Sequence, residues 1–257
     1  MKHITSRDNP QVKALRRLAQ DHLAYRKAGQ FWLEGDHLCR AALDRGVRPV
    51  QAVLSESFYA EQAQYWASLC DPMLVLPDAL FATLSGLESP ARMGFVVALP
   101  AQEQVLPGAT TVVLDRLQDA GNVGAILRCA SAFGYRQVLA IKGTAALWSP
   151  KVLRAGMGAH FGLHLVESVD LAAVAALQLP VLTTSSHEGP LLHELLRQKA
   201  LPRVCAWVFG HEGQGVSDEL MALADQKVRI AQPGGEESLN VATAAAICLH
   251  ASATAFD

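Results

Sequence analysis

The sequence predicts an α/β protein in which a small α/β domain precedes a larger α/β domain built on a parallel sheet. The chain has 257 residues, of which 51% are hydrophobic, so it can bury a sizeable core in one large domain or two smaller ones. Strand-like apolar runs alternate with helical stretches along most of its length. Beyond residue 110 the alternation becomes regular, which is typical of a parallel sheet with helices on both faces.

The first 45 residues are predicted to be mainly helical. The pair Asn9-Pro10 can begin a helix, because proline fits the first helical turn. The apolar residues of this helix recur at helical spacing, at Val12, Leu15 and Leu18. Its basic residues lie off that face, at Lys13, Arg16 and Arg17. A strand-like start at Phe31 then leads into a second helix in the stretch DHLCRAAL.

Residues 1–100 are expected to form the small domain. Its later apolar runs, separated by helical stretches, are Val50–Leu54, Met73–Leu76 and Gly94–Ala98. The stretch LPAQEQVLPGAT that follows holds two prolines, a glycine and few large apolar residues, as linkers do. We therefore predict a linker at residues 101–109 and a second domain at residues 110–257.

The second domain is expected to alternate strands with helices. Its strand-like runs are Thr111–Leu114, Gln137–Ile141, Pro180–Thr184, Ala206–Phe209 and Lys227–Ile230. Its helical segments are Val123–Phe133, Lys151–Met157, Leu191–Lys199, Ser217–Ala224 and Leu239–Ala253. Ligands of such sheets bind beyond the carboxyl ends of the strands, on the loops that follow them.

The charge is unevenly distributed. The formal net charge is −2, so the whole chain is not a strongly basic nucleic-acid binder. Residues 1–50, however, hold ten Lys and Arg against five Asp and Glu, which gives +5 and leaves −7 for the remainder. This asymmetry points to an anionic partner for the N-terminal part, and an ordinary solvated helix face explains it equally well.

Cysteine usage and missing motifs narrow the class of protein. The five cysteines are far apart, form no CxxC pair and are expected to be reduced core residues of a cytoplasmic protein. We expect no signal peptide and no membrane span, because charge, glycine or proline interrupts the longest apolar stretches. No hydrolase, kinase or metal-ligand spacing is present, so no metal site is predicted.

The first of three unusual loops lies in the stretch LDRLQDAGNVGAILRCASAFG. A strand ends at Asp115, a turn follows over Asp119 to Asn122, and a helix begins near Val123. Arg128 lies within that helix among apolar or small neighbours. Such an arginine must extend to solvent, pair with a carboxylate or meet an anionic ligand.

The second loop is the stretch GHEGQG, which directly follows an apolar run. Its three glycines would let the backbone approach a ligand closely. Glu212, in the middle of the loop, could act at a functional site or could only bind backbone amides. Ser217 is a candidate helix N-cap. The glycine spacing differs from the dinucleotide fingerprint, which disfavours a nicotinamide-binding fold.

The third loop, residues 231–237, precedes a helix rich in alanine. Ser238 is the candidate N-cap of this helix, and the glutamate before it favours a helix start. The small residues of the helix allow another element to approach closely. Either an ordinary core helix or a helix–helix interface would use that property.

The three loops together, in this order, resemble the three signature motifs of the SpoU/TrmH family of RNA ribose 2′-O-methyltransferases. The first motif, N-x-G-x-x-x-R, corresponds to Asn122, Gly124 and Arg128. The second, G-x-E-G-x-G, corresponds to Gly210, Glu212, Gly213 and Gly215. The third corresponds to Ser238, Leu239 and Asn240. The stretches SPKVLRAGMGAHF and ITSRDNPQVKALRRL resemble further family segments, so the likeness covers nearly the whole chain.

The resemblance implies a fold, a cofactor and an assembly. In the family, the C-terminal segment of the α/β domain passes through a loop and forms a deep trefoil knot, an exception to the rule that chains are unknotted. The second and third loops hold S-adenosylmethionine, and the last helix packs in a homodimer. The residues implied to contact the cofactor are Gly210, Ile230, Leu239, Thr184 and Gly215.

The resemblance also implies methyl transfer to a ribose 2′-OH in RNA, with ribosomal RNA first and tRNA as the other substrate class. Arg128 would lie by the target ribose and its phosphate. Because a guanidinium is normally protonated, a phosphate acting with Arg128 is as plausible as a general-base role for it. The remaining catalytic-site residues implied are Asn122, Glu212, Ser238 and Asn240. The residues expected to bind RNA are Arg154, Lys151, Arg7, Lys13, Arg16 and Arg17.

One departure from the family pattern keeps a second hypothesis open. The family usually has Ile-Pro-Met at the start of the third motif, whereas this chain has Ile230-Ala231-Gln232. The change supports a non-catalytic RNA-binding relative that associates with ribosomes, and the intact motif residues argue against it. A third hypothesis, a nucleotide-binding oxidoreductase, requires a glycine fingerprint that the sequence lacks.

Overall fold

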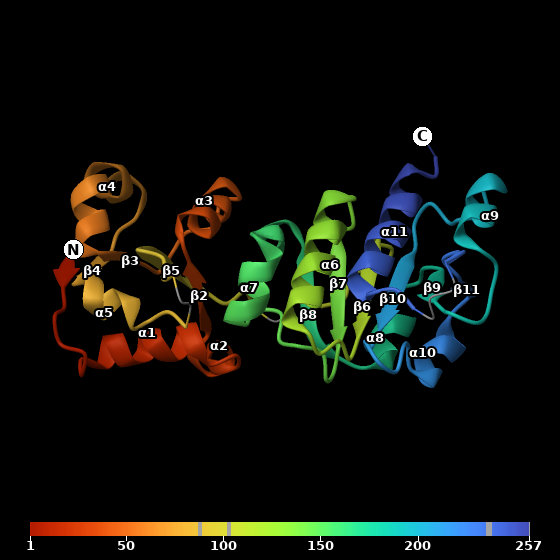
Figure 1. The fold of residues 1–257 in the computed structure, drawn as a ribbon, viewed down its shortest axis with the longest axis horizontal. Helices are drawn as coiled ribbons and strands as arrows, with labels where there is room; N and C mark the ends of the chain where they lie inside the picture. The colour runs from red at the N-terminus through yellow and green to blue at the C-terminus, as the bar shows by residue number, and fades with distance from the viewer. Residues whose placement is uncertain (87–88, 102–103, 235–237, 257) are drawn as a thin grey trace. The chain divides into compact units, whose positions relative to one another are not determined.

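The structure is a computed structural model that describes residues 1–86, 89–101, 104–234 and 238–256, and it divides into two compact units (Figure 1). One unit comprises Met1–Ala101 with Trp148–Phe161, and the other comprises Gln102–Leu147 with Gly162–Asp257. The segment Trp148–Phe161 therefore belongs to the first unit, although in sequence it separates two parts of the second. The domain limits set from the sequence stay a prediction.

The first unit contains a mixed sheet, in which the described strands follow the order β1-β4-β3-β5-β2. They are β1 (Lys2–His3), β2 (Gln30–Glu34), β3 (Gln51–Ser55), β4 (Met73–Leu76) and β5 (Met93–Ala98). Strand β5 is antiparallel to β2 and β3, and the remaining pairs are parallel. The predicted apolar runs are confirmed, whereas β1 is too short to show a pattern in the sequence.

The helices of this unit come from both of its chain segments. They are α1 (Pro10–Gln20), α2 (Ala24–Ala28), α3 (Asp36–Asp44), α4 (Glu56–Leu69), α5 (Asp78–Ala82), α7 (Pro150–Gly156) and the 3-10 helix η1 (Ala159–Gly162). The predicted start of α1 is confirmed, because the Asn9 side chain accepts a hydrogen bond from the N–H of Gln11 and Pro10 occupies the first turn. The predicted apolar face of α1 is buried against the sheet in the core of the unit.

The second unit contains a parallel sheet, as the sequence predicts. Its described strands follow the order β11-β9-β10-β6-β7-β8, and all their pairings are parallel. They are β6 (Thr111–Asp115), β7 (Gln137–Ile141), β8 (His164–Val169), β9 (Val181–Thr184), β10 (Ala206–Gly210) and β11 (Gln226–Val228). Strands β6 and β10 are neighbours, so the first and second loops leave the sheet side by side.

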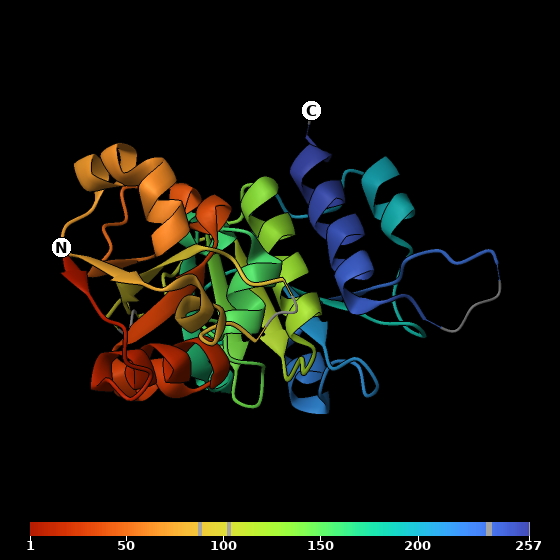
Figure 2. The same ribbon diagram turned by 60° about the vertical axis from the view of Figure 1, so that its left-hand side comes forward.

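Helices lie on both faces of the parallel sheet (Figure 2). They are α6 (Ala120–Ala132), α8 (Leu171–Ala175), α9 (Leu192–Arg197), α10 (Asp218–Leu223) and α11 (Val241–Thr254). Helix α6 packs against α11, whereas α8 packs against α10. The α8 and α10 residues Val174 and Leu220 share a buried cluster with the strand residues Val113 and Val208. The predicted α/β fold class is confirmed, and the trefoil knot stays a prediction.

Two elements of the second unit differ from the sequence expectation. The sequence pattern does not predict β8, because Glu167 and Ser168 interrupt its apolar run and its pairing slips between Ala140 and Ile141 of β7. It does not predict α8 either, because one turn is too short to show helical periodicity. No helix in the described ranges is both long enough and apolar enough to span a membrane.

Candidate active site

The site forms where β6 and β10 end, because these parallel neighbours run in register to Gly210 and Asp115. The first loop continues from β6 into α6, and the second follows β10. Asp119 caps α6, since its Oδ1 accepts a 2.7 Å hydrogen bond from the N–H of Asn122. Helix α6 therefore begins about one turn before the predicted position, with Asn122 in its first turn.

Glu212 joins the second loop to the first. Its Oε1 accepts hydrogen bonds from the N–H of Asp119 (3.0 Å) and from Nδ2 of Asn122 (3.2 Å), and its Oε2 accepts one from the N–H of Gln118 (3.1 Å). Partial burial opposes ionisation, but these donors outweigh it and lower the pKa of Glu212 below its ordinary value. The residue thus carries a negative charge and binds backbone amides.

Asn122 joins the first loop to the third. Its Oδ1 accepts a 3.0 Å hydrogen bond from Nδ2 of Asn240, while its Nδ2 donates to Glu212. Oδ1 of Asn240 in turn accepts from the N–H groups of Ala242 (2.9 Å) and Thr243 (3.2 Å). One chain of side chains, Glu212–Asn122–Asn240, therefore connects all three motifs.

The N-cap of the last helix is Asn240, which corrects the sequence expectation of Ser238. The helix begins at Val241. Asn240 is its cap because its side-chain oxygen accepts hydrogen bonds from N–H groups of the first turn, and because its own backbone is not helical. Ser238 is exposed and makes no hydrogen bond to the described residues. Only Leu239 separates Ser238 from Asn240. Because serine and asparagine cap helices almost equally well, the sequence alone does not choose between them.

Arg128 is exposed on α6. Among the residues that the structure describes, no carboxylate pairs with its guanidinium, so of the three alternatives solvent exposure and an anionic ligand remain. Gly124, one turn earlier, is buried.

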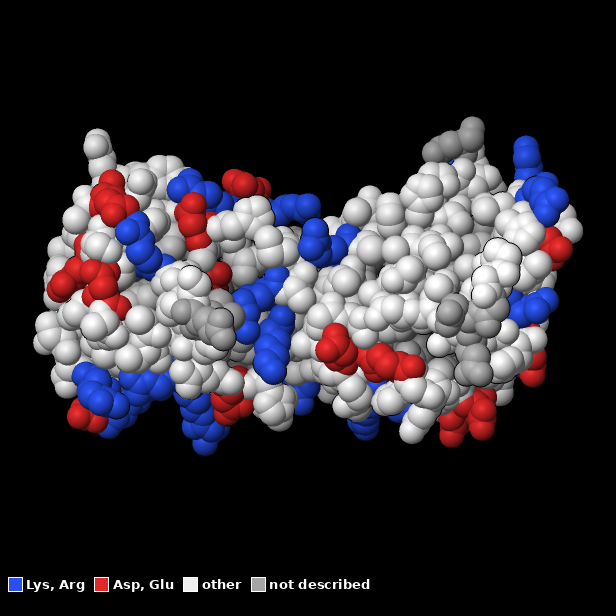
Figure 3. Space-filling model, in the orientation of Figure 1, with Lys and Arg blue, Asp and Glu red and all other residues white. Residues whose placement is uncertain are grey.

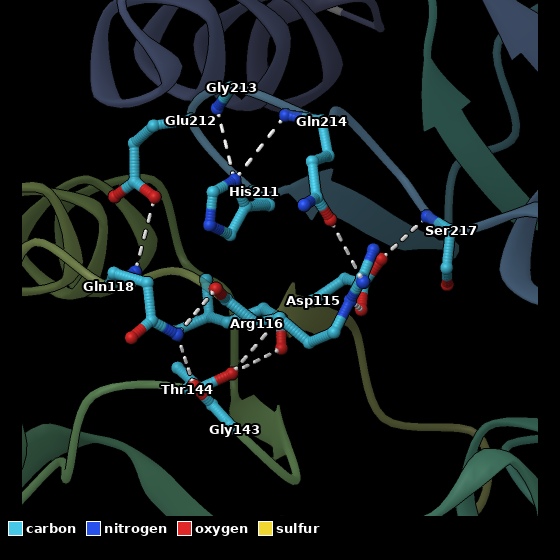
Figure 4. Close-up of polar contacts among 11 residues, drawn as sticks. Asp115, Arg116, Gln118, Gly143, Thr144, His211, Glu212, Gly213, Gln214 and Ser217 are labelled. Carbon is cyan, nitrogen blue, oxygen red and sulfur yellow. Dashed lines mark hydrogen bonds and ion pairs between the residues drawn. The ribbon is translucent and has the colours of Figure 1, made fainter.

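A second set of contacts, not anticipated from the sequence, lies beneath the loops (Figure 4). The nearly fully buried Asp115 accepts hydrogen bonds from the N–H of Ser217 (2.7 Å) and from Nε of Arg116 (3.0 Å). Nη1 of Arg116 donates to Oε1 of Gln214 at 3.2 Å. The sequence pattern places Asp115 at a strand end, but nothing in that pattern marks Arg116 as a contact of Asp115, or Gln214 as a contact of Arg116.

The second loop also has an internal support. Nδ1 of His211 accepts hydrogen bonds from the N–H groups of Gly213 (3.0 Å) and Gln214 (3.3 Å) (Figure 4). Ser217 occupies the N-cap position of α10 as predicted, but its side chain makes no capping bond. The N–H of Ser217 binds Asp115 instead, so the buried carboxylate fixes the end of the loop.

The residues that the resemblance assigns to the cofactor fit a nucleoside ligand. A Cβ at Gly210 would lie 2.1 Å from the carbonyl carbon of Gly215 and 2.1 Å from the nitrogen of Val216, so this backbone cradle admits only glycine. Among the described residues, no hydrogen bond involves the main chain of Ile230 or Leu239. Leu239 is 37% exposed, which leaves an apolar side chain and main-chain groups available to a ligand.

The altered third motif leaves a further acceptor available. Ala231 is exposed, whereas Oε1 of Gln232 is buried and accepts no hydrogen bond from the described residues. A buried acceptor without a donor is unfavourable until a ligand or water satisfies it. Thr184 ends β9 half-buried, and residues 235–237 of the loop lie outside the described residues. No group of His, Cys, Asp or Glu in the described ranges could hold a metal ion.

Comparison with known proteins places these features in a family. Residues 109–250, which include all three loops, match the model of the SpoU rRNA Methylase family. The chain belongs to the SpoU rRNA methylase family. Residues 9–94 match an MRM3-like substrate binding domain, the kind of module expected ahead of a SpoU domain.

Several relatives match this SpoU chain over nearly its whole length. It is 28% identical to the 23S rRNA (guanosine(2553)-2′-O)-methyltransferase RlmP of Bacillus subtilis, covering 97% of this chain and 98% of that protein. A solved structure from Porphyromonas gingivalis, assigned to the TrmH family, is 31% identical with a TM-score of 0.81, covering 94% and 96% of the two chains. An S-adenosylmethionine-bound rRNA methyltransferase from Sinorhizobium meliloti is 26% identical with a TM-score of 0.81, covering 97% and 96%.

The basic residues expected to bind RNA lie in the first unit. A groove of about 370 Å³ on α1 is lined by Lys13, Arg16, Arg17, Gln20 and Asp21. The three cations of this groove already contact other side chains of the protein. Lys13 pairs with Asp8 at 3.1 Å, Arg17 pairs with Asp21 at 3.7 Å, and Nη2 of Arg16 donates to the Thr83 hydroxyl at 2.9 Å.

The remaining predicted RNA contacts are the exposed Arg7 and two residues of α7, Lys151 and Arg154. Lys151 is exposed, whereas Nη1 of Arg154 lies 3.9 Å from Oε2 of the buried Glu34. In the first unit, Lys and Arg gather along the α1 edge, and Asp and Glu gather near α4 (Figure 3). The acidic residues of the α4 side include Glu56, Glu61 and Asp78. The α1 side of this unit is therefore more basic than the α4 side.

Proposed function

We propose that the chain is an S-adenosylmethionine-dependent methyltransferase that methylates a ribose 2′-OH in ribosomal RNA. The observation that carries the proposal is the chain of hydrogen bonds Glu212–Asn122–Asn240, which links the three family motifs in one place. The full-length likeness to named rRNA 2′-O-methyltransferases supports the same activity. tRNA remains the second substrate class.

The reaction requires an activated 2′-OH and an aligned methyl donor. S-adenosylmethionine supplies an electrophilic methyl group, so the protein mainly positions the reactants. Correct alignment alone can lower a barrier by about 7–11 kcal/mol in ideal cases. The cradle at Gly210, Gly215, Ile230 and Leu239 would hold the cofactor, with Thr184 at the end of β9 beside it.

Arg128 is proposed to act on the target ribose. Its exposed guanidinium, free of carboxylate partners among the described residues, can bind the RNA phosphate next to that ribose. The 2′-OH proton then passes to an oxygen of that phosphate, or to Arg128 itself where its guanidinium is deprotonated, as the ribose oxygen takes up the methyl group. Asn122 and Glu212 would fix the start of α6, and with it the position of Arg128. Ser238 and Asn240 would complete the nucleotide pocket.

The first unit is proposed to bind the RNA. The match to an MRM3-like substrate binding domain and the basic edge of α1 support this role. The bound RNA would contact Arg7, Lys13, Arg16, Arg17, Lys151 and Arg154. Phosphate contacts of this kind usually dominate RNA affinity. The substrate domain would span residues 1–100 and the methyltransferase domain residues 110–257, joined by the linker at 101–109.

The assembly is proposed to be a homodimer formed through α11 in a knotted second domain, in the cytoplasm. Exposed apolar side chains at Ile247 and Phe256, on and just beyond α11, support burial of this surface by a second copy. The deep trefoil knot is supported by the family assignment. The reduced cysteines are compatible with a cytoplasmic location.

The non-catalytic alternative gains no support. Its one argument from sequence is the Ala231-Gln232 change, and the relatives described above are named or classed as methyltransferases. A relative without catalytic activity would be free to lose the motif residues. In this chain they are present, and three of them form a chain of hydrogen bonds.

Replacement of Arg128 by alanine tests the proposal. Methyl transfer from radiolabelled S-adenosylmethionine to an unmodified 23S rRNA transcript should fall to background in Arg128→Ala, while calorimetric binding of the cofactor stays unchanged. Arg136→Ala is the matched control, because Arg136 is also an exposed arginine of the second unit but precedes β7 at its amino end. Methyl transfer that persists in Arg128→Ala would refute the assignment.

A further inference from the structure

Arg116 has a backbone conformation that arginine rarely adopts. Its φ is +58°, in the left-handed region that disfavours residues with a Cβ. The hydroxyl of Thr144 holds this conformation, because it accepts a 3.0 Å hydrogen bond from the N–H of Arg116 and donates a 2.9 Å bond to the carbonyl of Leu114. Strained residues that neighbours hold in place concentrate at functional sites.

The conformation directs the Arg116 side chain toward the second loop (Figure 4). Nε donates to Asp115 and Nη1 donates to Gln214, while Nη2 makes no hydrogen bond to any described residue. The Asp115 side chain is only 1% exposed, whereas that of Arg116 is 35% exposed. A buried carboxylate therefore fixes one edge of the guanidinium and leaves the other edge open to solvent.

The location suits an RNA phosphate. Arg116 directly follows β6, and two residues later the N–H of Gln118 donates to Glu212 of the site network. The other charged groups of these two loops, Asp115, Asp119 and Glu212, are carboxylates. A phosphate brought to this edge of the sheet needs a cation close by, and arginine offers a planar fork of donors that matches phosphate geometry.

We propose that Arg116 binds a second backbone phosphate of the RNA substrate, besides the phosphate assigned to Arg128 next to the target ribose. The proposal rests on the methyltransferase function proposed above. The competing explanation is that Arg116 only braces the second loop, by holding Gln214 to the end of β6. The two explanations predict different losses when the guanidinium is removed. Loss of a brace would weaken the cofactor cradle, whereas loss of a phosphate ligand would weaken RNA binding.

Two substitutions at Arg116 distinguish these explanations. Arg116→Gly removes the guanidinium and also suits the left-handed φ, so the backbone keeps its conformation without strain. Arg116→Lys keeps the charge and loses the fork. We expect Arg116→Gly to raise KM for an unmodified 23S rRNA transcript roughly tenfold, with kcat changed by less than about twofold.

Salt dependence gives a second, independent measure. The slope of log affinity against log salt, from fluorescence anisotropy with the labelled transcript, should fall by about one in Arg116→Gly. Arg116→Lys should restore most of that slope, since lysine still binds phosphate as a point charge. Thr144→Val, which removes the hydroxyl that holds the backbone, should raise KM in the same direction.

An unchanged KM and salt slope in Arg116→Gly, together with weaker calorimetric binding of S-adenosylmethionine or a lower kcat, would establish the brace and overturn the proposal. Methyl transfer by the unaltered protein on the same transcript tests the proposed function separately. If that transfer were absent, the function would fail, and the salt slope of RNA binding would still decide whether Arg116 contacts a phosphate.

Discussion

Nδ2 of Asn240 donates a 3.0 Å hydrogen bond to Oδ1 of Asn122, which joins residues 118 positions apart in the chain. Each asparagine lies at the start of a helix, Asn122 in the first turn of α6 and Asn240 at the N-cap of α11. The two helices also pack against each other. The hydrogen bond between these two side-chain amides therefore helps to fix the start of α6 relative to the start of α11, where residues of the first and third motifs lie.

Substitution of Asn240 should separate stability from activity. Asn240→Ser retains a good N-cap, whereas Asn240→Ala loses it, so we expect unfolding free energy to change by less than about 0.5 kcal/mol in the serine variant and to fall by about 1 kcal/mol in the alanine variant. Neither side chain reaches Asn122, so both variants should lose methyl transfer to a similar degree. Urea unfolding and single-turnover assays measure the two effects, and full activity in Asn240→Ser would contradict the role of the amide pair.

Protonation of Glu212 should weaken the fold at low pH. The pKa of Glu212 is lower in the folded state than in the unfolded chain, so its stabilising contribution is complete above the unfolded value, about 4.3, and is lost as the pH falls through the folded value. The difference in unfolding free energy between the unaltered protein and Glu212→Gln should be constant from pH 7 to pH 6 and shrink below about pH 4.3. A difference that grows on acidification would show that the carboxyl is held protonated instead.

Alanine substitution at two glycines of the second motif should have different effects on cofactor binding. At Gly210 a Cβ would lie 2.1 Å from backbone atoms of Gly215 and Val216, whereas at Gly213 a Cβ would lie 3.9 Å from the His211 ring. Gly210→Ala must displace the loop, and we expect it to abolish cofactor binding in calorimetry. Gly213→Ala should bind the cofactor with nearly unchanged affinity, and equal losses in both variants would argue against the backbone cradle.

Local patterns predicted most of the second unit. Strand β7 coincides with its predicted limits because its apolar run is bounded by polar residues, and the order of strands and helices beyond residue 110 is confirmed except for β8 and α8. The sequence also identified the loops whose side chains meet, since glycine and functional polar residues after an apolar run are a local signal. These features depend on neighbouring residues, which is why sequence reasoning finds them.

Features that depend on distant residues were not predictable. The choice of Asn240 over Ser238 as N-cap is favoured by the contact with Asn122, and the left-handed Arg116 depends on the hydroxyl of Thr144. Likewise, the sequence pattern assigns the segment Trp148–Phe161 to the second domain, whereas its contacts place it in the first unit. The determining partner in each case lies elsewhere in the chain.

The segment Trp148–Phe161 gives the first unit a discontinuous sequence. A Cβ at Gly158 would lie 2.8 Å from Cβ of Ala41, and Phe31 lies with its ring centroid 4.8 Å from that of Trp148, so this segment is closely fitted to the unit. A fragment cut at the linker would leave α7 on the wrong side and expose the surfaces it covers. Exchange of this substrate module between enzymes by simple end-to-end recombination would therefore fail, and the two parts must be inherited together.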